Sequence, residues 1–398
     1  MRTIRWIGWG FGEALIPVLI IGLTGTFAGA GLLNATFDVT LLLALPVIGV
    51  LTERFPAKYI IIAGALLYPF VGISYFVAGA TSLALFVVIA RAINGISWGL
   101  DINGIDTYFR RMAPGESLAS SFGMLDTVAN LGWLVAMLCG IWLIRYFSVG
   151  DLLFLVAPFS LIALPFALKA PKDHPAQGKS KKKPPLHEAY RAAIAEWQEW
   201  SGDLRLLGLL LLFTETISVL ISFFIPIDIY LKSNSLTLVI LFTAVTTLPS
   251  IFGYILGQIA DHREKHRLAA VACVIMALVL FAISLPVPYM FTVLGGLVLG
   301  ILIELLSVLQ KSLATKLTPA ERWGRLDSVF EIISGISDLA APVLLGVTLD
   351  LFGFPLVASI LAAIALLLAF VFIFTTHPRP LKLPGGAWIH LPPPKHEI

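Results

Sequence analysis

Charged residues are scarce in this chain. Only 13% of its 398 residues are Asp, Glu, Lys or Arg, whereas 58% are hydrophobic, and the mean hydropathy is +0.92. Soluble domains carry about 25% charged residues, so this composition excludes a soluble globular protein of ordinary type. The formal net charge of +3 gives no general basic character, and we therefore expect no nucleic-acid partner.

Cysteine is almost absent. Cys139 and Cys273 lie in separate apolar runs, which excludes a disulfide framework. None of the seven histidines falls within an apolar run, which argues against a histidine proton relay. No cluster has the spacing of zinc ligands, and no nucleophile with a neighbouring base is recognisable. We expect no metal, no cofactor and no enzyme.

Long apolar runs, in contrast, are abundant. About twelve runs reach the length of about 20 residues that a membrane-spanning helix needs, and they are too continuous for barrel strands. The expected fold is an all-α integral membrane protein. We expect its helices at residues 4–23, 29–52, 59–77, 83–109, 117–146, 152–168, 204–231, 236–259, 268–285, 289–313, 326–349 and 354–375.

A polar interval divides the chain into two similar halves. We expect a first six-helix bundle at residues 1–168, a linker at 169–203, a second bundle at 204–375 and a tail at 376–398. Within the linker, Tyr190, Ile194, Trp197 and Trp200 recur at helical spacing, which predicts a short helix in the membrane interface. A cleaved signal peptide at residues 1–30 is the alternative for the first helix, but Glu13 would interrupt its hydrophobic region.

Basic residues predict the orientation. They cluster in alternate connections, on the same side as both termini, and the opposite connections hold only Arg145 and Lys232. Because cytoplasmic loops of membrane proteins are enriched in Lys and Arg, both termini are expected in the cytoplasm, and the protein in the cell membrane.

Two sequence patterns occur once in each half. Gly49-Val-Leu51-Thr-Glu53-Arg54-Phe-Pro-Ala-Lys58 corresponds to Gly257-Gln-Ile259-Ala-Asp261-His-Arg263-Glu-Lys265. At a nearly constant offset, Gly123-Met-Leu125-Asp126 corresponds to Gly324-Arg-Leu326-Asp327. Such a duplication predicts two six-helix units of the kind that form secondary transporters.

On these residues, nearly the whole chain resembles the major facilitator superfamily. The paired turns are similar to that family's signature loops, and Arg91-Ala-Ile-Asn94-Gly95 resembles its fourth-helix pattern. The first loop departs from the pattern, because Glu53 replaces Asp and Pro56 replaces Gly. The resemblance implies two pseudo-symmetric bundles with a substrate site near the bilayer midplane, exposed alternately to each side, and it implies that helices 3, 6, 9 and 12 face lipid. Those four expected helices hold no Asp, Glu, Lys or Arg.

The ionisable residues within the other helices are candidates for function, because a charge in lipid costs about 2.5–3.5 kcal/mol. We take Arg91 as the only base at depth, paired with Glu13 or Asp38. Candidates for proton coupling or substrate binding are Glu13, Asp38, Arg91, Glu215 and Asp338. Each acid could instead be a structural hydrogen-bond partner, and Pro17 and Pro226 are expected to bend their helices.

A second set of residues belongs to the signature loops and to an inner gate at the cytoplasmic end. They are Gly49, Glu53, Arg54, Lys58, Asp126, Gly257, Asp261, Arg263, Lys265, Glu304, Asp327 and Glu331.

The leading hypothesis is a proton-coupled transporter of a small organic solute, working as a monomer in the lipid bilayer. The excess of interior acids motivates the proton and leaves room for a cationic substrate. Efflux of amphipathic compounds is an alternative in the same class, and a non-transporting sensor that keeps the fold is an alternative in another. The sequence names no substrate.

Overall fold

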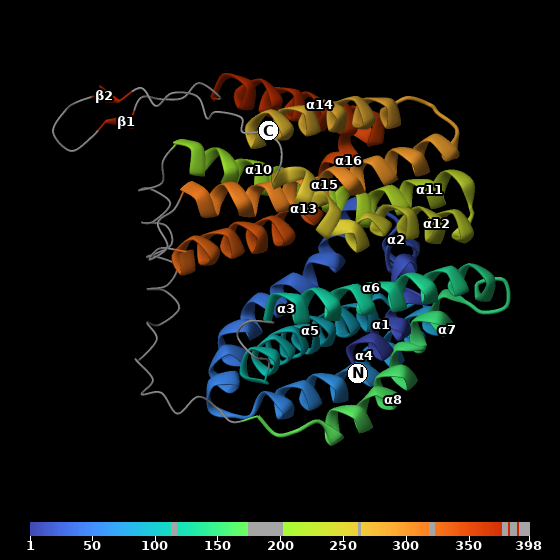
Figure 1. Ribbon diagram of the computed structural model, residues 1–398. Helices are drawn as coiled ribbons and strands as arrows, with labels where there is room; N and C mark the ends of the chain where they lie inside the picture. Colours follow the sequence, from blue (N-terminus) through green and yellow to red (C-terminus); the bar gives the residue numbers. More distant parts are fainter. Residues whose placement is uncertain are drawn as a thin grey trace.

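The computed structural model describes residues 1–112, 118–173, 202–261, 264–317 and 323–375, with two short strands beyond them. Figure 1 shows the helices in two groups, one blue to green and the other yellow-green to red. The N-terminal half consists of α1 (Arg2–Gly10), η1 (Glu13–Leu15), α2 (Ile16–Thr24), α3 (Phe27–Arg54), α4 (Ala57–Thr81), α5 (Ala84–Met112), α6 (Leu118–Leu143), α7 (Val149–Phe154) and α8 (Val156–Lys169).

The C-terminal half is likewise helical. It consists of α10 (Gly202–Val219), η3 (Leu220–Phe224), α11 (Ile225–Ser233), α12 (Leu236–Thr247), η4 (Leu248–Phe252), α13 (Gly253–Asp261), α14 (Lys265–Ser284), α15 (Tyr289–Leu317) and α16 (Trp323–Thr375). The strands β1 (Leu381–Lys382) and β2 (Trp388–Ile389) pair antiparallel.

The expected membrane helices are confirmed as a class. Among the described residues, nine helices are long and apolar enough to cross a bilayer, and residues 127–143 and 236–252 form shorter apolar helices. The last of the nine covers 43 residues, 332–374, and contains Gly353 with a φ of 76°. Because that left-handed conformation interrupts a helix, α16 contains the two helices expected at 326–349 and 354–375.

Two of the long spans are broken near their middle, where the sequence predicted bends. In the first, α1 ends at Gly10 and α2 begins just before Pro17. In the seventh, α10 gives way to the π-helical segment η3 before Pro226 in the first turn of α11. Proline cannot donate to the carbonyl four residues earlier, and its ring clashes with that carbonyl. The residues at those positions are Glu13 and Ser222, so each break alters the backbone where a polar side chain occurs.

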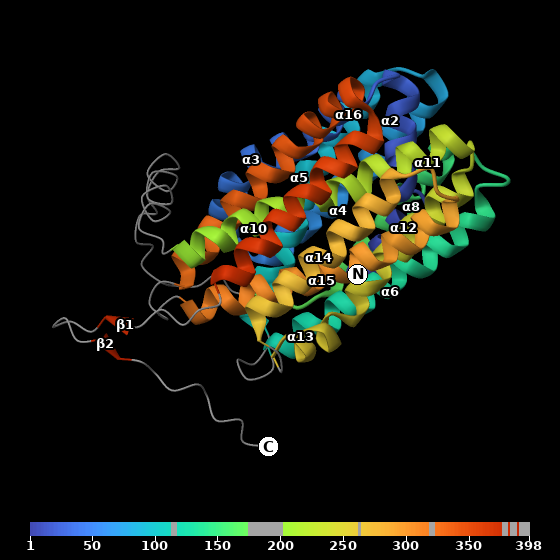
Figure 2. The same ribbon diagram turned by 90° about the horizontal axis from the view of Figure 1, so that it is seen from above.

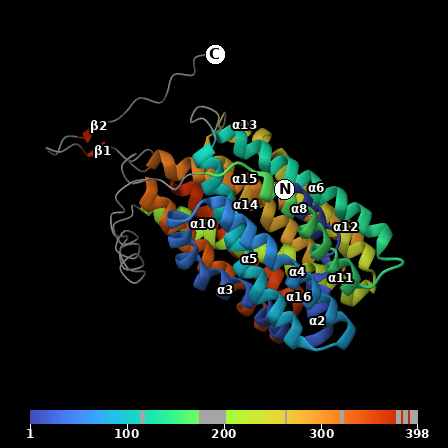
Figure 3. The ribbon, with the colours of Figure 1, turned by 90° about the horizontal axis from the view of Figure 1, so that it is seen from below.

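The helices of both halves run roughly along one direction (Figure 2). Seen from below, the helices of the N-terminal half lie in front of those of the C-terminal half (Figure 3). Contacts of α3 with α16, of α6 with α12 and of α2 with α11 join the two halves. We call these contacts the seam. The two ends of the helix bundle need names. The 'linker end' is the end at which α3 connects to α4 and at which α8 terminates. The 'hairpin end' is the opposite end, which holds the short connections at residues 25–26, 82–83 and 234–235.

At the hairpin end the seam is close-packed. A Cβ added at Gly31 on α3 would overlap the carbonyl of Pro342 on α16, and one added at Gly346 would lie 2.5 Å from the carbonyl oxygen of Phe27. Asp350 accepts hydrogen bonds from the backbone N–H groups of Phe27 and Ala28, at 2.9 and 2.8 Å. The C-terminal half therefore caps the first turn of α3, where backbone N–H groups lack partners within the helix.

Candidate functional site

A cavity of about 320 Å³ lies between the two halves near the middle of the spans. This volume is at the lower limit of small-molecule sites. The side chains that form its wall come from the breaks in the first and seventh spans and from α3, α5 and α16: Trp9, Glu13, Ile16, Pro17, Asn34, Phe37, Asp38, Arg91, Asn94, Trp98, Val219, Ser222, Phe223, Asp338 and Pro342.

The two halves contribute different chemistry to this wall. The N-terminal half supplies two carboxylates, the guanidinium of Arg91 and two carboxamides. The C-terminal half supplies Val219, Phe223 and Pro342, with Ser222 and Asp338 as its polar members. We call these the polar wall and the apolar wall. Apolar and aromatic side chains also belong to the polar wall: Trp9, Ile16, Pro17, Phe37 and Trp98. A molecule that fills the cavity therefore meets most of the charged groups on one side, and on the other side three apolar side chains with one hydroxyl and one carboxyl group.

Glu13 lies at the break in the first span, in η1. Glu13 is exposed and is one of the residues that line the cavity. The indole N–H of Trp133 on α6 donates a hydrogen bond of 2.7 Å to Glu13 Oε2. An indole N–H can only donate, so this contact orients the carboxyl group through one of its two oxygens.

Arg91 on α5 is 9% exposed and binds Asn34 on α3. Its Nη2 donates to the side-chain oxygen of Asn34 at 2.6 Å and to the backbone carbonyl at 3.1 Å, and its guanidinium lies 4.8 Å from the ring centre of Phe37. The expected partners, Glu13 and Asp38, are near enough to attract it electrostatically. Among the described residues, however, the hydrogen bonds of its guanidinium go to Asn34, whose role the sequence analysis missed.

The acids of the C-terminal half are placed differently. Asp338 on α16 lines the cavity. Glu215 on α10 accepts a hydrogen bond of 3.3 Å from the hydroxyl of Ser334 and is not one of the lining residues. Glu304 on α15 lies against the start of α13, because a Cβ on Gly253 would be 2.9 Å from Glu304 Oε1. The structure thus brings Glu13, Asp38, Arg91 and Asp338 together and leaves Glu215 and Glu304 apart from them.

A second buried base was missed. Arg5 on α1 and Asp101 on α5 are each 3% exposed and form an ion pair, with the ring centre of Tyr68 5.4 Å from the guanidinium. Because Arg5 lies in the first turn of α1, near the linker end, it is buried in protein rather than deep in the membrane, and the expectation that Arg91 is the only base at depth stays a prediction. Arg5 lies four residues before the buried Trp9, on a helix that begins at Arg2. Because it is so close to the start of the chain, the sequence analysis did not count it among the charges inside the protein.

Comparison with known proteins identifies the family that has this architecture. The family model described as Major Facilitator Superfamily matches residues 3–316. The chain belongs to the Major Facilitator Superfamily. A curated relative, the quinolone resistance protein NorA of Staphylococcus aureus, is 26% identical over 132 residues, which is 33% of each chain. The chain therefore matches only about a third of that relative's length.

Solved structures show the same superfamily fold. A mutant of the nucleoside transporter NupG has a TM-score of 0.78 at 15% identity, covering 94% of this chain and 98% of its own. A D-xylose-proton symporter has a TM-score of 0.70 at 14% identity, covering 93% and 95%. At these identities the likeness concerns the fold alone. The superfamily and its fold are those of transporters rather than enzymes.

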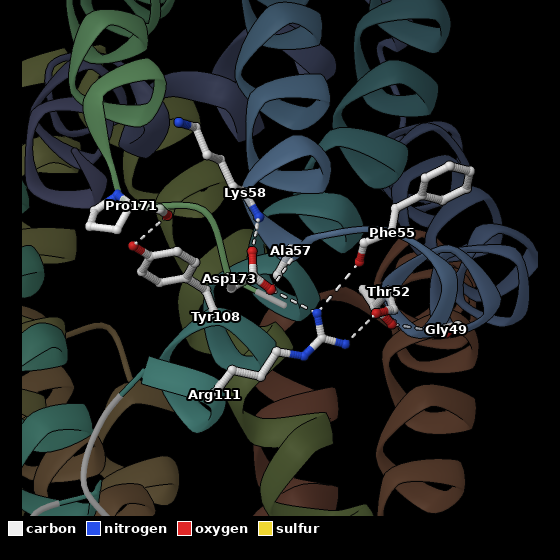
Figure 4. A network of polar contacts seen from close by, with 9 residues as sticks. All are labelled: Gly49, Thr52, Phe55, Ala57, Lys58, Tyr108, Arg111, Pro171 and Asp173. Atoms are coloured by element: carbon white, nitrogen blue, oxygen red, sulfur yellow. Dashed lines mark hydrogen bonds and ion pairs between the residues drawn. The ribbon is translucent and has the colours of Figure 1, made fainter. Parts of the chain in front are cut away.

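The first signature loop of this superfamily member is held by a polar cluster at the linker end (Figure 4). Asp173, which follows α8, accepts hydrogen bonds from the backbone N–H groups of Ala57 and Lys58 at 2.9 and 3.1 Å. Arg111 at the end of α5 donates to Asp173 at 2.7 Å and to the carbonyl of Thr52 at 2.7 Å. The loop between α3 and α4 is thus fixed to the ends of α5 and α8.

The electrostatics of this cluster favour ionised Asp173. Its side chain is fully buried, and burial alone would raise the pKa of its carboxyl. The hydrogen bonds from Arg111 and from the two backbone N–H groups outweigh that effect and hold the pKa below its ordinary value. Lys58 adds hydrogen bonds of 2.7 Å from Nζ to the carbonyls of Leu168 and Ala170.

Other expected members of the signature loops and inner gate are less informative. Gly49 has open space around it, Arg54 is exposed, and Lys265 donates from Nζ to the hydroxyl of Ser312. Arg263 lies outside the described residues. Six further members of this set belong to described helices, but their side chains or surroundings lie outside the description: Glu53, Asp126, Gly257, Asp261, Asp327 and Glu331. The expected linker helix with Tyr190 and Trp197 also lies outside them. These expectations stay predictions.

Proposed function

We propose that this Major Facilitator Superfamily protein carries a small organic solute across the membrane by alternating access, and that the solute moves together with protons. The observation that carries the proposal is the central cavity, because both halves line it and carboxyl groups face it. A site between two rocking units can be exposed to each side in turn. The close seam at the hairpin end supports a state in which that end is shut.

Glu13 is the first candidate for the proton carrier. It combines access to the cavity with a fixed donor, the indole N–H of Trp133. A carboxyl group accepts that hydrogen bond whether or not its other oxygen carries a proton, so Glu13 can load and release a proton without losing its position. Asp38 and Asp338 on the facing walls are further candidates. Glu215 would act from outside the cavity.

The surroundings proposed for the protein follow from the distribution of charge. The basic connections of the sequence lie at the linker end, which we assign to the cytoplasm together with both termini. The cell membrane is the proposed location. Both halves of the cavity wall come from one chain, which supports a functional monomer.

The test is a measurement of internal pH in proteoliposomes of the purified protein, with and without an imposed pH gradient. The solute panel should contain D-xylose, a nucleoside, free amino acids and tetraphenylphosphonium. We expect at least one solute to cause proton flux, and we expect Glu13→Gln to reduce that flux roughly a hundredfold because a neutral amide carries no transferable proton. Asp151→Asn in the exposed cap of α7 is the matched control.

Two results would contradict the proposal. Solute movement without proton flux would make the protein a facilitated carrier, with its cavity acids serving only to bind. Equal loss of flux in Glu13→Gln and Glu215→Gln would mean that position in the cavity does not decide which acid carries the proton.

Efflux of amphipathic compounds is a second candidate function. The apolar wall of Val219, Phe223 and Pro342 favours it, together with the similarity of a third of the chain to a quinolone resistance protein. Expression of the protein in a drug-sensitive bacterium should then raise the inhibitory concentration of quinolones or lipophilic cations. Resistance unchanged by Phe223→Ala would contradict a role of the apolar wall in binding such compounds.

A further inference from the structure

The polar wall carries both signs of charge. Glu13 in η1 and Asp38 on α3 supply carboxylates, and Arg91 on α5 supplies a guanidinium that attracts both. A site for a simple cation gains nothing from an arginine in its wall, and a site for a simple anion gains nothing from two carboxylates. A wall with both signs complements a ligand that also carries both signs.

The hydrogen-bonding capacity of these groups is only partly used within the protein. Glu13 accepts from Trp133 through Oε2, and the side chain of Asp38 lines the cavity with a hydrogen bond from its own backbone N–H. Arg91 uses Nη2 for Asn34, while its Nε has no partner in the described part of the chain. Asn94, 6% exposed, likewise has a buried side-chain oxygen without one.

Unpaired polar groups at this depth cost about 1–3 kcal/mol each. They therefore favour an occupant that both donates and accepts. An ammonium group can donate to Asp38 and to the other oxygen of Glu13, and a carboxylate can accept from the guanidinium of Arg91. Because Nη2 of Arg91 donates to Asn34 and Nε is enclosed by protein, a ligand's carboxylate would accept from Nη1, in a charge-assisted hydrogen bond.

The apolar wall lies opposite these charges. Val219 and Phe223 come from the end of α10 and from η3, and Pro342 from α16. The break before Pro226 brings Phe223 into this wall. A ligand whose charged groups bind the polar wall would place any side chain against this hydrocarbon surface. The cavity volume of about 320 Å³ suits a molecule of amino-acid size better than a peptide of several residues.

We propose that the cavity binds an amphipathic zwitterion, an α-amino acid or a close analogue with an apolar side chain. Its ammonium group binds Asp38 and Glu13, its carboxylate binds Arg91, and its side chain packs on Phe223 and Val219. This proposal rests on the proposed transport function and specifies its substrate class. With a coupling proton on Glu13, the polar wall presents one charge of each sign to the ligand, from Asp38 and Arg91.

The charged groups that face this site come from several elements. Arg91 on α5 and Tyr75 on α4 lie near Glu13, and so does Tyr68 on α4. Asp338 on α16 is the charged group of the apolar wall and takes part in further interactions of its own. Because Asp338 lies across the cavity from Arg91, the ligand's carboxylate is expected on the Arg91 side, away from that acid.

The experiment compares binding of four small molecules that share one carbon skeleton or one head group. They are L-leucine, isopentylamine without the carboxylate, 4-methylpentanoate without the ammonium group, and glycine without the side chain. Binding to purified protein is measured by isothermal calorimetry, with D-xylose as a neutral polyol. We expect L-leucine to bind roughly tenfold or more tightly than each of the others, because every deletion leaves one group of the wall unpaired.

Variants then assign each end of the ligand. Arg91→Gln should weaken binding of L-leucine roughly tenfold and leave isopentylamine unchanged. Asp38→Asn should weaken binding of isopentylamine and leave binding of 4-methylpentanoate unchanged. Phe223→Ala should reduce the difference between L-leucine and glycine. Asp151→Asn is the control for the loss of one carboxylate elsewhere.

Several outcomes would overturn the proposal. Isopentylamine binding as tightly as L-leucine, with no effect of Arg91→Gln, would assign the cavity to organic cations. Binding of D-xylose alone would assign it to polyols, and failure of all four compounds to bind would remove the zwitterion assignment. If another solute still drives proton flux in proteoliposomes, only the substrate class has failed. If no solute does, the proposed coupling has failed as well.

Discussion

The interior of the N-terminal half and the seam between the halves are held together by different contacts. Within the half, buried charges join the helices: Arg5 pairs with Asp101, and Arg111 pairs with Asp173. At the seam, α3 and α16 approach through Gly31 and Gly346, and one exposed carboxylate, that of Asp350, caps a helix.

The difference indicates which contacts can open during transport. Removing one partner of a buried ion pair costs about 3–5 kcal/mol, so the helices of the N-terminal half should stay together. Separation of two closely packed helices loses mainly dispersion contacts, and loss of a helix cap costs about 0.5–2 kcal/mol. If the proposed alternating access holds, we expect the N-terminal half to move as a unit and the seam to part.

Among changes to the seam, the largest effect is expected from Gly31→Ala, which would force α3 and α16 apart. The added Cβ would overlap the carbonyl of Pro342, so α3 and α16 must separate at the hairpin end. Overpacking of this kind costs about 1–3 kcal/mol and would shift the protein away from the state described above. We expect transport to fall roughly tenfold while the Tm changes little.

Spin labels would measure the separation directly. Thr81→Cys on α4 and Lys232→Cys on α11 place one label at the hairpin end of each half, after replacement of Cys139 and Cys273 by alanine. The distance distribution should shift to longer values in Gly31→Ala. Gly22→Ala on α2, where a Cβ would meet open space, is the control. An unchanged distribution in Gly31→Ala would show that the close approach does not hold the seam shut.

Asp173→Asn, inside the half, is expected to affect stability rather than the seam. Asparagine is uncharged and cannot form the ion pair with Arg111. Its side chain has one acceptor oxygen where aspartate has two, so the cluster of Figure 4 is weakened. Loss of such charge-assisted hydrogen bonds costs about 1.5–3 kcal/mol. We expect a lower Tm in detergent and no change in the distance between the two spin labels.

The pH dependence of stability gives the second measurement for this variant. Because folding lowers the pKa of Asp173, its contribution is complete above the unfolded pKa of about 3.9 and is lost as the pH falls through the lower pKa of the folded protein. The difference in Tm between wild type and variant should therefore shrink below about pH 4. A difference that stays constant at acid pH would show that the charge of Asp173 is not what stabilises the loop.

Much of this architecture was predictable from sequence because the bilayer imposes long apolar helices. The runs, the duplicated turns and the bends at Pro17 and Pro226 all depend on local composition. The merging of the last two helices into α16 depends on Gly353, whose backbone conformation is not visible in the chain alone. The predicted presence of Glu13, Asp38 and Arg91 in the interior followed from the cost of charge in lipid.

The partners of these residues could not be predicted in the same way. Which atom binds Arg91 depends on how α3 is rotated relative to α5. From the sequence we expected Glu13 or Asp38 as the partner of Arg91, whereas in the structure Arg91 donates its hydrogen bond to Asn34. Arg5 was overlooked because basic residues near a helix start usually lie in the interface. Asp173 follows α8 and reaches a loop more than a hundred residues earlier, and no local pattern records such a contact.

The smallest effect is expected from Asp350→Asn, which would sharpen the comparison by weakening the seam without steric strain. Asparagine keeps one oxygen that can accept from Phe27 or Ala28 and loses the negative charge that favours a helix N-terminus. The change should cost about 0.3–1 kcal/mol and move the spin-label distances in the same direction as Gly31→Ala, but less far. The Tm should be close to that of wild type, because Asp350 joins the halves and leaves the interior of each intact. A lower Tm without any change in the spin-label distance would show that Asp350, like Asp173, stabilises one half. The distinction between a rigid half and a parting seam would then fail at this position.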